Sequence, residues 1–299
     1  MGSYFNIEGV IPPVITPFLE NGQVDYEGFE ENIHKWNACG LSGYLILGSN
    51  SETPYLTKEE KLRLVKIARR AAAPGMLVFA GTGMESTVAT VELTNEMAGC
   101  GADGALVLTP CFFKDQMGAD AMVRYYSVVA DQSRIPIMIY NATKFTGVNI
   151  TADAVSRLSR HPNIIGMKDS AGNIAQFMSF FTAGLDQEFN MMVGTASAWY
   201  PSMTIGIDAG IMALANCCPR ECVQQQKLFR EKKYEQAFEL YQRMFPVNAC
   251  VTGKLGVPAL KYACDRLGYR GGSVRAPLAP LTSEQKKTVD GILEQAGLI

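Results

Sequence analysis

A lysine and a tyrosine end two apolar segments of this sequence, and both side chains can do carbonyl chemistry. Lys168 follows the run "NIIGM", and Tyr140 ends the run "IPIMIY". Among apolar neighbours the charged form of a lysine is penalised, which lowers the pKa of the amine. A neutral amine attacks a ketone or aldehyde to form an imine, and a phenol can supply and accept the protons that this chemistry needs. The pattern indicates an imine-forming lysine with a tyrosine as its proton shuttle.

The residue pattern leaves other interpretations open. Lys168 could instead pair with Asp169 on a loop, and a tyrosine at a strand end is often a packing aromatic with a solvated hydroxyl. The segment "GSNSE" (48–52) offers hydroxyls and backbone N–H groups that could hold a carboxylate. It could equally be a plain turn with a serine capping a helix.

Eight short apolar runs recur along the chain without clean alternation of polar residues, as is typical of parallel strands covered on both faces. They are residues 9–16, 43–48, 76–81, 104–109, 135–140, 163–168, 190–195 and 210–215.

Helical patterns separate the runs. Residues 57–72 begin with Thr57 and have Glu60 three residues later, as in a capping box. Leu64, Ile67, Ala68 and Ala71 share one face of this predicted helix; residues 87–101 and 152–161 follow the same plan.

Eight strands with intervening helices predict an α/β fold, a (β/α)8 TIM barrel with a C-terminal helical extension. We place the catalytic barrel domain at residues 1–218 and a C-terminal helical domain at 219–299, where the strand pattern stops. The alternative is an open doubly wound sheet. Its GxGxxG fingerprint is absent after the first strand, since "GTGMES" (81–86) follows the third.

Barrel enzymes carry their chemistry at the C-terminal ends of the strands. Those ends hold Tyr140 and Lys168, and they supply Thr16, Gly194 and Met212 as further candidates for substrate binding.

Composition excludes several classes of protein. The formal net charge is −2 with no basic run, which disfavours a nucleic-acid partner. No apolar stretch is long enough to span a membrane, and "MGSYFNIEGV" lacks the pattern of a secretory signal. The eight cysteines show no paired CxxC spacing and only two histidines occur, so we expect no metal site. We expect a cytoplasmic protein with free thiols.

Several motifs occur in order along the whole chain: "GVIPPVITPF", "GSNSE", "TP" at 109–110, "YN" at 140–141 and "GMKDS" around the lysine. With them the chain resembles the dihydrodipicolinate synthase / N-acetylneuraminate lyase superfamily of pyruvate-dependent class I aldolases. The resemblance implies a barrel with a C-terminal helical domain and a homotetramer built as a dimer of dimers. It implies no metal or organic cofactor.

The resemblance also implies roles for particular residues. Lys168 corresponds to the Schiff-base lysine and Tyr140 to the proton shuttle. Ser49 and Asn50 correspond to the residues that hold the carboxylate of pyruvate or another 2-oxo acid.

Two positions depart from the synthases of this superfamily. Phe112 replaces a tyrosine that reaches into the neighbouring subunit's site, and a phenyl ring has no proton to pass. Phe145 replaces an arginine that binds the second substrate's carboxylate, which a phenyl ring cannot do. We include both among the candidate substrate-binding residues, and together they argue against a dihydrodipicolinate synthase.

The sequence looks most like the 4-hydroxy-2-oxoglutarate aldolase and 2-keto-3-deoxy sugar acid aldolase branch, on "TPC", "HPNIIGMKDS" and "GVPALKYACDRLGYRGGSVRAPL". Ser51 is a departure, because it replaces a loop glycine. We predict a carbon–carbon lyase that cleaves or forms a 4-hydroxy-2-oxo acid or 2-keto-3-deoxy acid, giving pyruvate and an aldehyde. The alternatives are a 4-hydroxy-tetrahydrodipicolinate (dihydrodipicolinate) synthase, a Schiff-base sugar-acid dehydratase, or a pyruvate-binding regulator without catalysis.

Overall fold

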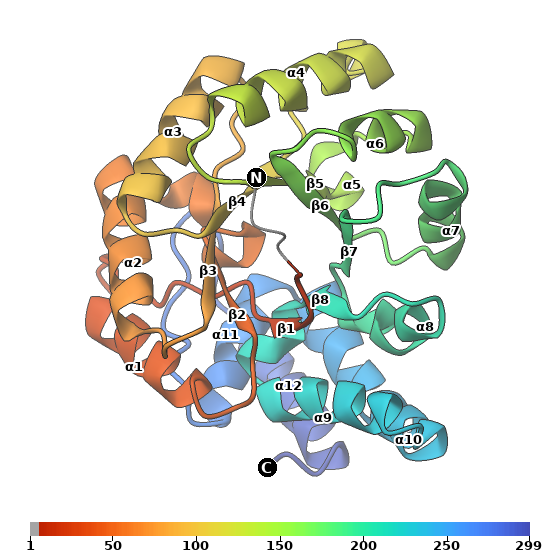
Figure 1. The fold of residues 1–299 in the computed structure, drawn as a ribbon. Coiled ribbons are helices and arrows are strands. Elements are labelled where there is room, and N and C mark those ends of the chain that lie inside the picture. Colours follow the sequence, from red (N-terminus) through yellow and green to blue (C-terminus); the bar gives the residue numbers. More distant parts are fainter. Residues whose placement is uncertain (1–5) are drawn as a thin grey trace.

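The computed structural model describes residues 6–299, and in them eight parallel strands form one sheet (Figure 1). Residues 1–5 lie outside the described part, and with them the start of the expected barrel domain and of the N-terminal segment examined for a signal. The strands are β1 (Gly9–Ile11), β2 (Gly43–Ile46), β3 (Leu77–Gly81), β4 (Gly104–Leu108), β5 (Ile137–Asn141), β6 (Ile164–Asp169), β7 (Asn190–Val193) and β8 (Ala209–Ile211).

The sheet closes on itself. Each strand pairs with its neighbour in sequence from β2 to β8, and β8 pairs with β1. The last gap, between β1 and β2, is bridged by backbone hydrogen bonds from Val14 N to Leu45 O (2.8 Å) and from Leu45 N to Pro12 O (3.0 Å). The predicted (β/α)8 barrel is therefore confirmed, and the open doubly wound sheet was the wrong alternative.

Helices surround the strands (Figure 1). Thr57 and Glu60 form the predicted capping box in front of α2, each side chain accepting from the other residue's backbone N–H. The predicted face of α2, from Leu64 to Ala71, is buried. The outer helices are α1 (Tyr26–Trp36), α2 (Lys58–Ala71), α3 (Thr87–Gly99), α4 (Ala119–Gln132), α5 (Thr143–Thr146), α6 (Ala152–Leu158), α7 (Ile174–Thr182) and α8 (Trp199–Thr204).

Apolar side chains are buried on both faces of the sheet, in two clusters, which explains why the strands are continuous apolar runs in the sequence. One fills the barrel interior and includes Leu45, Phe79, Met138 and Tyr140. The other lies between the sheet and the helices and includes Val78 and Ile139, the strand neighbours of Phe79 and Met138. Successive side chains of a strand point to opposite faces, and here both faces are buried.

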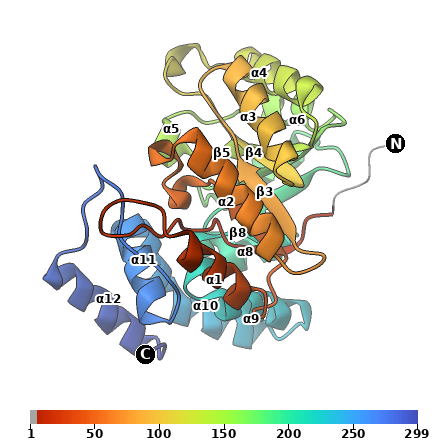
Figure 2. The ribbon, with the colours of Figure 1, turned by 90° about the vertical axis from the view of Figure 1, so that its left-hand side faces the viewer.

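The chain after β8 is helical, as predicted, and lies against the barrel beside α1 (Figure 2). Its helices are α9 (Pro219–Arg230), α10 (Tyr234–Asn248), α11 (Val257–Arg266) and α12 (Ser283–Gln295), with a π-helical turn over Ala249–Lys254. The segment after α11 contacts α1 through the Asn32 side chain, which donates to Arg270 O (2.8 Å) and accepts from Arg270 N (2.7 Å).

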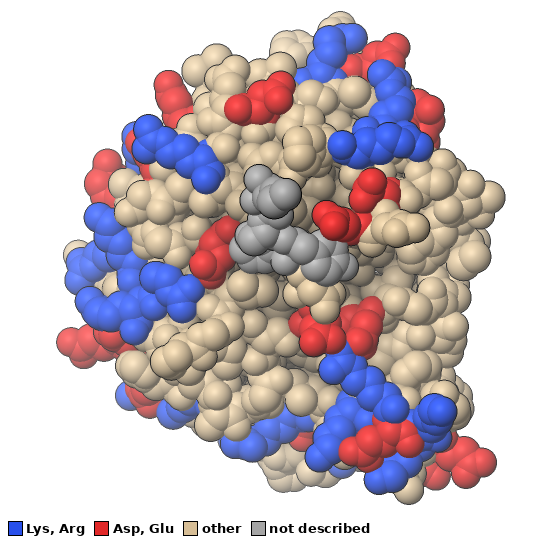
Figure 3. Space-filling model, in the orientation of Figure 1, with Lys and Arg blue, Asp and Glu red and all other residues tan. Residues whose placement is uncertain are grey.

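Charged side chains of both signs stand side by side around the edge of the face drawn in Figure 3. No helix within residues 6–299 combines the length and the apolar character needed to cross a bilayer.

Candidate active site

Tyr140 and Lys168 are directly opposite each other on neighbouring strands. The register of β5 and β6 pairs the two residues. The Lys168 Nζ lies 4.3 Å from the centroid of the Tyr140 ring, and both side chains are buried. The sheet thus brings together the amine and the phenol that the sequence singled out.

The neighbouring carboxylate does not pair with this amine. Asp169 accepts hydrogen bonds from Asn141 Nδ2 (2.7 Å), Gln176 Nε2 (2.6 Å) and Ala171 N (2.7 Å). Lys168 makes no ion pair with any residue of 6–299. The loop ion pair considered from the sequence is therefore absent from the described chain, because consecutive residues of a strand face opposite sides of the sheet.

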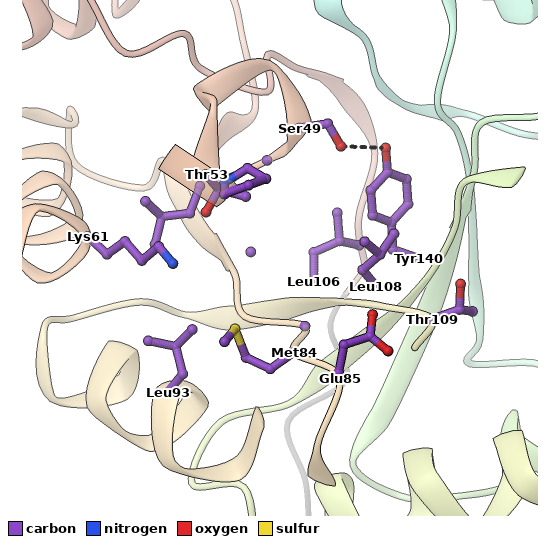
Figure 4. Close-up of a pocket in the computed structure, with 15 residues that line it drawn as sticks. Ser49, Thr53, Lys61, Met84, Glu85, Leu93, Leu106, Leu108, Thr109 and Tyr140 are labelled. Atoms are coloured by element: carbon purple, nitrogen blue, oxygen red, sulfur yellow. Dashed lines mark hydrogen bonds between the residues drawn. The ribbon is translucent and has the colours of Figure 1, made fainter. Parts of the chain in front are cut away.

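The environment of Tyr140 makes its phenol a stronger acid than a free tyrosine. Burial alone would raise the pKa of this phenol, but the positive charge of Lys168 and hydroxyl contacts from Ser49 and Ser170 outweigh burial and lower the pKa below its usual value. The Ser49 Oγ lies 3.4 Å from the Tyr140 hydroxyl (Figure 4). A phenol of lowered pKa next to an amine is suited to moving protons.

The loop after β2 carries Ser49 and Asn50, both half-buried, in a 3₁₀ turn over Ser49–Ser51. The Ser51 hydroxyl donates to Val14 O, and the Ser51 carbonyl accepts from Thr16 Oγ1 (2.9 Å). Thr16 is fully buried and its hydroxyl supports this loop. The serine that replaces the loop glycine therefore faces the segment that follows β1.

Gly194 and Met212 occupy tight positions at the ends of β7 and β8. The Gly194 N–H donates to Asp169 O (2.7 Å), and a Cβ at this position would overlap the Ser170 hydroxyl. Met212 is fully buried and belongs to the cluster between sheet and helices, and its N–H donates to Ile11 O (3.2 Å).

Phe112 and Phe145 are both exposed, unlike the buried Lys168 and Tyr140. Phe112 is 77 % exposed and packs edge-on against Phe113, with ring centroids 5.0 Å apart. Phe145 is 61 % exposed. Within a single chain neither ring lines the cavity described next.

A cavity of about 300 Å³ opens beside Tyr140 (Figure 4). Tyr140 and Ser49 form one part of its wall, whereas Lys168 lies outside the lining. The remaining lining residues come from strands β3 and β4, from the loops after β2, β3 and β4, and from helices α2 and α3: Leu47, Gly48, Thr53, Pro54, Lys61, Gly81, Gly83, Met84, Glu85, Leu93, Leu106, Leu108 and Thr109.

Sequence reasoning missed Lys61 and Glu85, and it named Thr109 only as part of the "TP" motif, without a role at the site. For Lys61 a signal existed: it precedes Leu64 by three residues and Ala68 by seven, which puts it on the buried face of α2. A charged residue on an apolar helix face faces the interior or a cavity. Glu85 follows "GTGM" in a loop, and nothing in the neighbouring sequence indicates that this loop would place Glu85 in the lining of the cavity.

Comparisons with known proteins agree with this fold over the whole described chain. The model of the dihydrodipicolinate synthetase family matches residues 6–296. A 4-hydroxy-tetrahydrodipicolinate synthase of Methanothrix thermoacetophila is 31 % identical over 285 residues, 95 % of either chain. A dihydrodipicolinate synthase of Acinetobacter baumannii, solved in complex with pyruvate, superposes with a TM-score of 0.92 at 27 % identity and covers 98 % of this chain and 100 % of that one.

The structure of dihydrodipicolinate synthase from Aquifex aeolicus gives a TM-score of 0.89 at 30 % identity, covering 97 % of this chain and 98 % of that one. The chain belongs to the dihydrodipicolinate synthetase family. It is thereby a carbon–carbon lyase of the pyruvate-dependent class I aldolase type, and the resemblance inferred from the motifs is confirmed at the level of the superfamily.

Proposed function

We propose that this enzyme forms a Schiff base between Lys168 and pyruvate and joins the resulting enamine to an aldehyde. The observation that carries the proposal is the pairing of a buried amine and a buried phenol across β5 and β6, 4.3 Å from nitrogen to ring centroid. The pyruvate complex of the related synthase supports the choice of first substrate.

The residues have the following roles in this proposal. Lys168 first gives up a proton, and its free amine then attacks C2 of pyruvate; loss of water gives an iminium that draws electrons from C3. Tyr140, with Ser49 beside it, takes and returns the protons of these steps. The enamine carbon then attacks the aldehyde, and hydrolysis of the new iminium frees the amine. Backbone N–H groups near Ser49 and Asn50 offset the carboxylate charge.

The relatives favour the synthase direction. Relatives from Methanothrix thermoacetophila and Methanosphaerula palustris are named 4-hydroxy-tetrahydrodipicolinate synthase, so our leading candidate is that condensation. From the sequence alone, cleavage of a 4-hydroxy-2-oxo acid was the first candidate function and the synthase an alternative; the relatives reverse that ranking. Cleavage stays as the second candidate because Phe112 and Phe145 lack the polar groups that the synthases carry at these positions.

Trapping with borohydride tests the proposal. Incubation with pyruvate and borohydride should add the mass of a reduced pyruvate adduct to the peptide that contains Lys168. The variant Lys168→Ala should show no adduct, whereas Lys66→Ala, on the exposed side of α2, should react as the native enzyme does. An unmodified native enzyme would refute the Schiff base.

Product analysis then separates the candidates. A synthase forms 4-hydroxy-tetrahydrodipicolinate from pyruvate and its partner aldehyde. A cleaving aldolase releases pyruvate from hydroxyoxoglutarate or a 2-keto-3-deoxy acid, and a dehydratase returns an oxo acid with an unchanged carbon count.

We also propose a homotetramer in the cytoplasm. The exposed aromatic pair Phe112 and Phe113 and the exposed Val88 support burial against a second copy. Oligomeric state is independent of this fold, since a structure described as a monomeric dihydrodipicolinate synthase variant superposes with a TM-score of 0.93 at 22 % identity. The eight free thiols support a reducing compartment.

A further inference from the structure

Asn141 and Asp169 are the last residues of β5 and β6, and each directly follows one member of the pair formed by Tyr140 and Lys168. The register places Asn141 opposite Asp169, one position beyond that pair. Both side chains are fully buried. Because successive side chains of a strand point to opposite faces, they lie behind the sheet, on the side of the helices. There Asn141 Nδ2 donates to Asp169 Oδ2 at 2.7 Å.

This hydrogen bond belongs to a closed ring of four side chains. Asn141 Nδ2 also donates to Asn149 Oδ1 (2.8 Å), in the segment after α5. Asn149 Nδ2 donates to Gln176 Oε1 (3.0 Å), on α7. Gln176 Nε2 closes the ring by donating to the same Asp169 oxygen (2.6 Å). The ring therefore ties the ends of β5 and β6 to each other and to the helical layer.

Two backbone N–H groups fix the direction in which the ring runs. The Ile150 N–H donates to Asn141 Oδ1 (3.2 Å), so the amide nitrogen of Asn141 faces Asp169. The Ala171 N–H donates to Asp169 Oδ1 (2.7 Å), the carboxylate oxygen outside the ring. The amide and the carboxylate that join the two strand ends are thus each held in one orientation.

The carboxylate of this ring has no cation. Within residues 6–299 Asp169 forms no ion pair, and its hydrogen bonds come from neutral donors. A buried carboxylate without a cation is costly, and an apolar pair could join two strands without that cost. Directional hydrogen bonds give what an apolar contact does not, a single relative position of the groups that they join.

The same network holds a residue that contacts the phenol. The Ser170 N–H donates to the backbone carbonyl of Asn141 (3.0 Å), and the next N–H along the chain donates to Asp169. The Ser170 hydroxyl contacts the Tyr140 hydroxyl and contributes to the lowered pKa of that phenol. Asp169 therefore reaches Tyr140 by two routes, through the end of β5 and through the start of the loop after β6.

We propose that Asp169 is a positioning residue: through Asn141 and the loop after β6 it holds the Tyr140 phenol in place beside the reacting amine. The inference rests on the proposed function, in which that amine forms the Schiff base. Displacing a catalytic group by about 1 Å can slow a reaction about 100-fold, so a ring behind the sheet can control the rate without touching the substrate.

The test reverses the ring. Asp169→Asn turns an amide nitrogen toward the nitrogen of Asn141, and Asn141→Asp sets two carboxylates against each other. The double variant Asn141→Asp/Asp169→Asn moves the carboxylate to β5. Its ring can be satisfied again in the opposite direction, because the amides of Asn149 and Gln176 can each turn over. Each single variant breaks the link between the strand ends, and the double variant restores it.

The matched control is Asp103→Asn. Asp103 precedes β4 at the other end of the barrel, where its carboxylate accepts from the Val78 N–H (2.7 Å) and from Arg69 (3.0 Å). The substitution makes the same chemical change next to a strand, away from Tyr140.

Two measurements are made on every protein. One is the ultraviolet titration of Tyr140, taken as the difference from the same protein carrying Tyr140→Phe. The other is the rate at which pyruvate is trapped on Lys168 under borohydride. In Asp169→Asn we expect the tyrosinate to form at higher pH and trapping to slow about 10- to 100-fold. Loss of a negative charge alone would favour the tyrosinate and move its titration to lower pH, so the direction separates positioning from a charge effect.

The double variant should regain the native titration and trapping rate, and Asp103→Asn should keep both. The inference is overturned if the titration in Asp169→Asn stays in place or moves to lower pH, or if the double variant remains as slow as the single ones. Where a single variant does not fold, the double variant decides: native values support the inference, and a protein that is unfolded or slow refutes it. A native enzyme that traps no pyruvate removes the proposed function, whereas the titration still reports whether Asp169 positions Tyr140.

Discussion

Lys261 of α11 and Glu52 of the loop after β2 form an ion pair of 2.5 Å in which both side chains are only 1 % exposed. The two residues are 209 positions apart in the sequence. Glu52 has a left-handed backbone (φ 55°), which is unfavourable for a residue other than glycine, and its second carboxylate oxygen accepts from Arg275 N (2.8 Å). The C-terminal helices thus set the loop that presents Ser49 to Tyr140.

Breaking this pair should destabilise the enzyme. Lys261→Met leaves the Glu52 carboxylate buried without its cation, which we expect to lower the free energy of unfolding by about 3–5 kcal/mol in urea titrations. Lys35→Met removes a lysine from an exposed pair with Glu31 and should change stability little. If both variants lost the same free energy of unfolding, the buried pair would contribute no more to stability than the exposed one.

The pairing of Tyr140 with Lys168 should be visible in the titration of the phenol. The difference in ultraviolet absorbance between native enzyme and Tyr140→Phe should show a tyrosinate forming below pH 10, since the pKa is lowered. Lys168→Met removes the cation but leaves Tyr140 buried. The absorbance difference between Lys168→Met and the double variant Lys168→Met/Tyr140→Phe should therefore show a tyrosinate that forms only above pH 10. A signal that stays in place would show that Lys168 does not set this pKa.

The Tyr140→Phe variant itself should turn over more slowly by about 100- to 10,000-fold, the usual contribution of one positioned acid–base group.

A methyl group at Gly194 should disturb the ends of β6 and β7. The added Cβ would overlap the Ser170 hydroxyl and lie 2.9 Å from the Asp169 carbonyl oxygen. We expect Gly194→Ala to cost about 1–3 kcal/mol of stability and to reduce the yield of pyruvate adduct. Gly99→Ala is the control, because no atom lies within 4 Å of its added Cβ. If Gly194→Ala were as stable and as reactive as the native enzyme, the ends of β6 and β7 would be able to accommodate the methyl group without loss of stability.

The exposed ring of Phe112 should matter for assembly. Phe112→Asp places a charge on an aromatic patch that we propose to be covered by a second chain, and sedimentation should then show a smaller species than the tetramer that we propose for the native enzyme. Val128→Asp, on the outer side of α4, should sediment as the native protein does. A native enzyme that sediments as a monomer would remove the basis of this prediction.

The barrel was predictable because eight apolar runs and one capping box have purely local causes. The proximity of Tyr140 and Lys168 followed from the rule that barrel strand ends meet, and the register of β5 and β6 agrees with it. The link from Lys261 to Glu52 was out of reach, because no local pattern connects residues so distant in the chain. The exposure of Phe112 and Phe145 likewise depends on loop paths that residue types do not determine.

The register of β5 and β6 also limits how this enzyme can change. Inserting or deleting one residue within either strand would turn the phenol or the amine to the other side of the sheet, because side chains alternate along a strand. Length variation that keeps the chemistry is therefore confined to the loops, including those that carry Thr53, Glu85 and Thr109. Under the proposed function, new aldehyde partners can arise there while the positions of Tyr140 and Lys168 stay fixed.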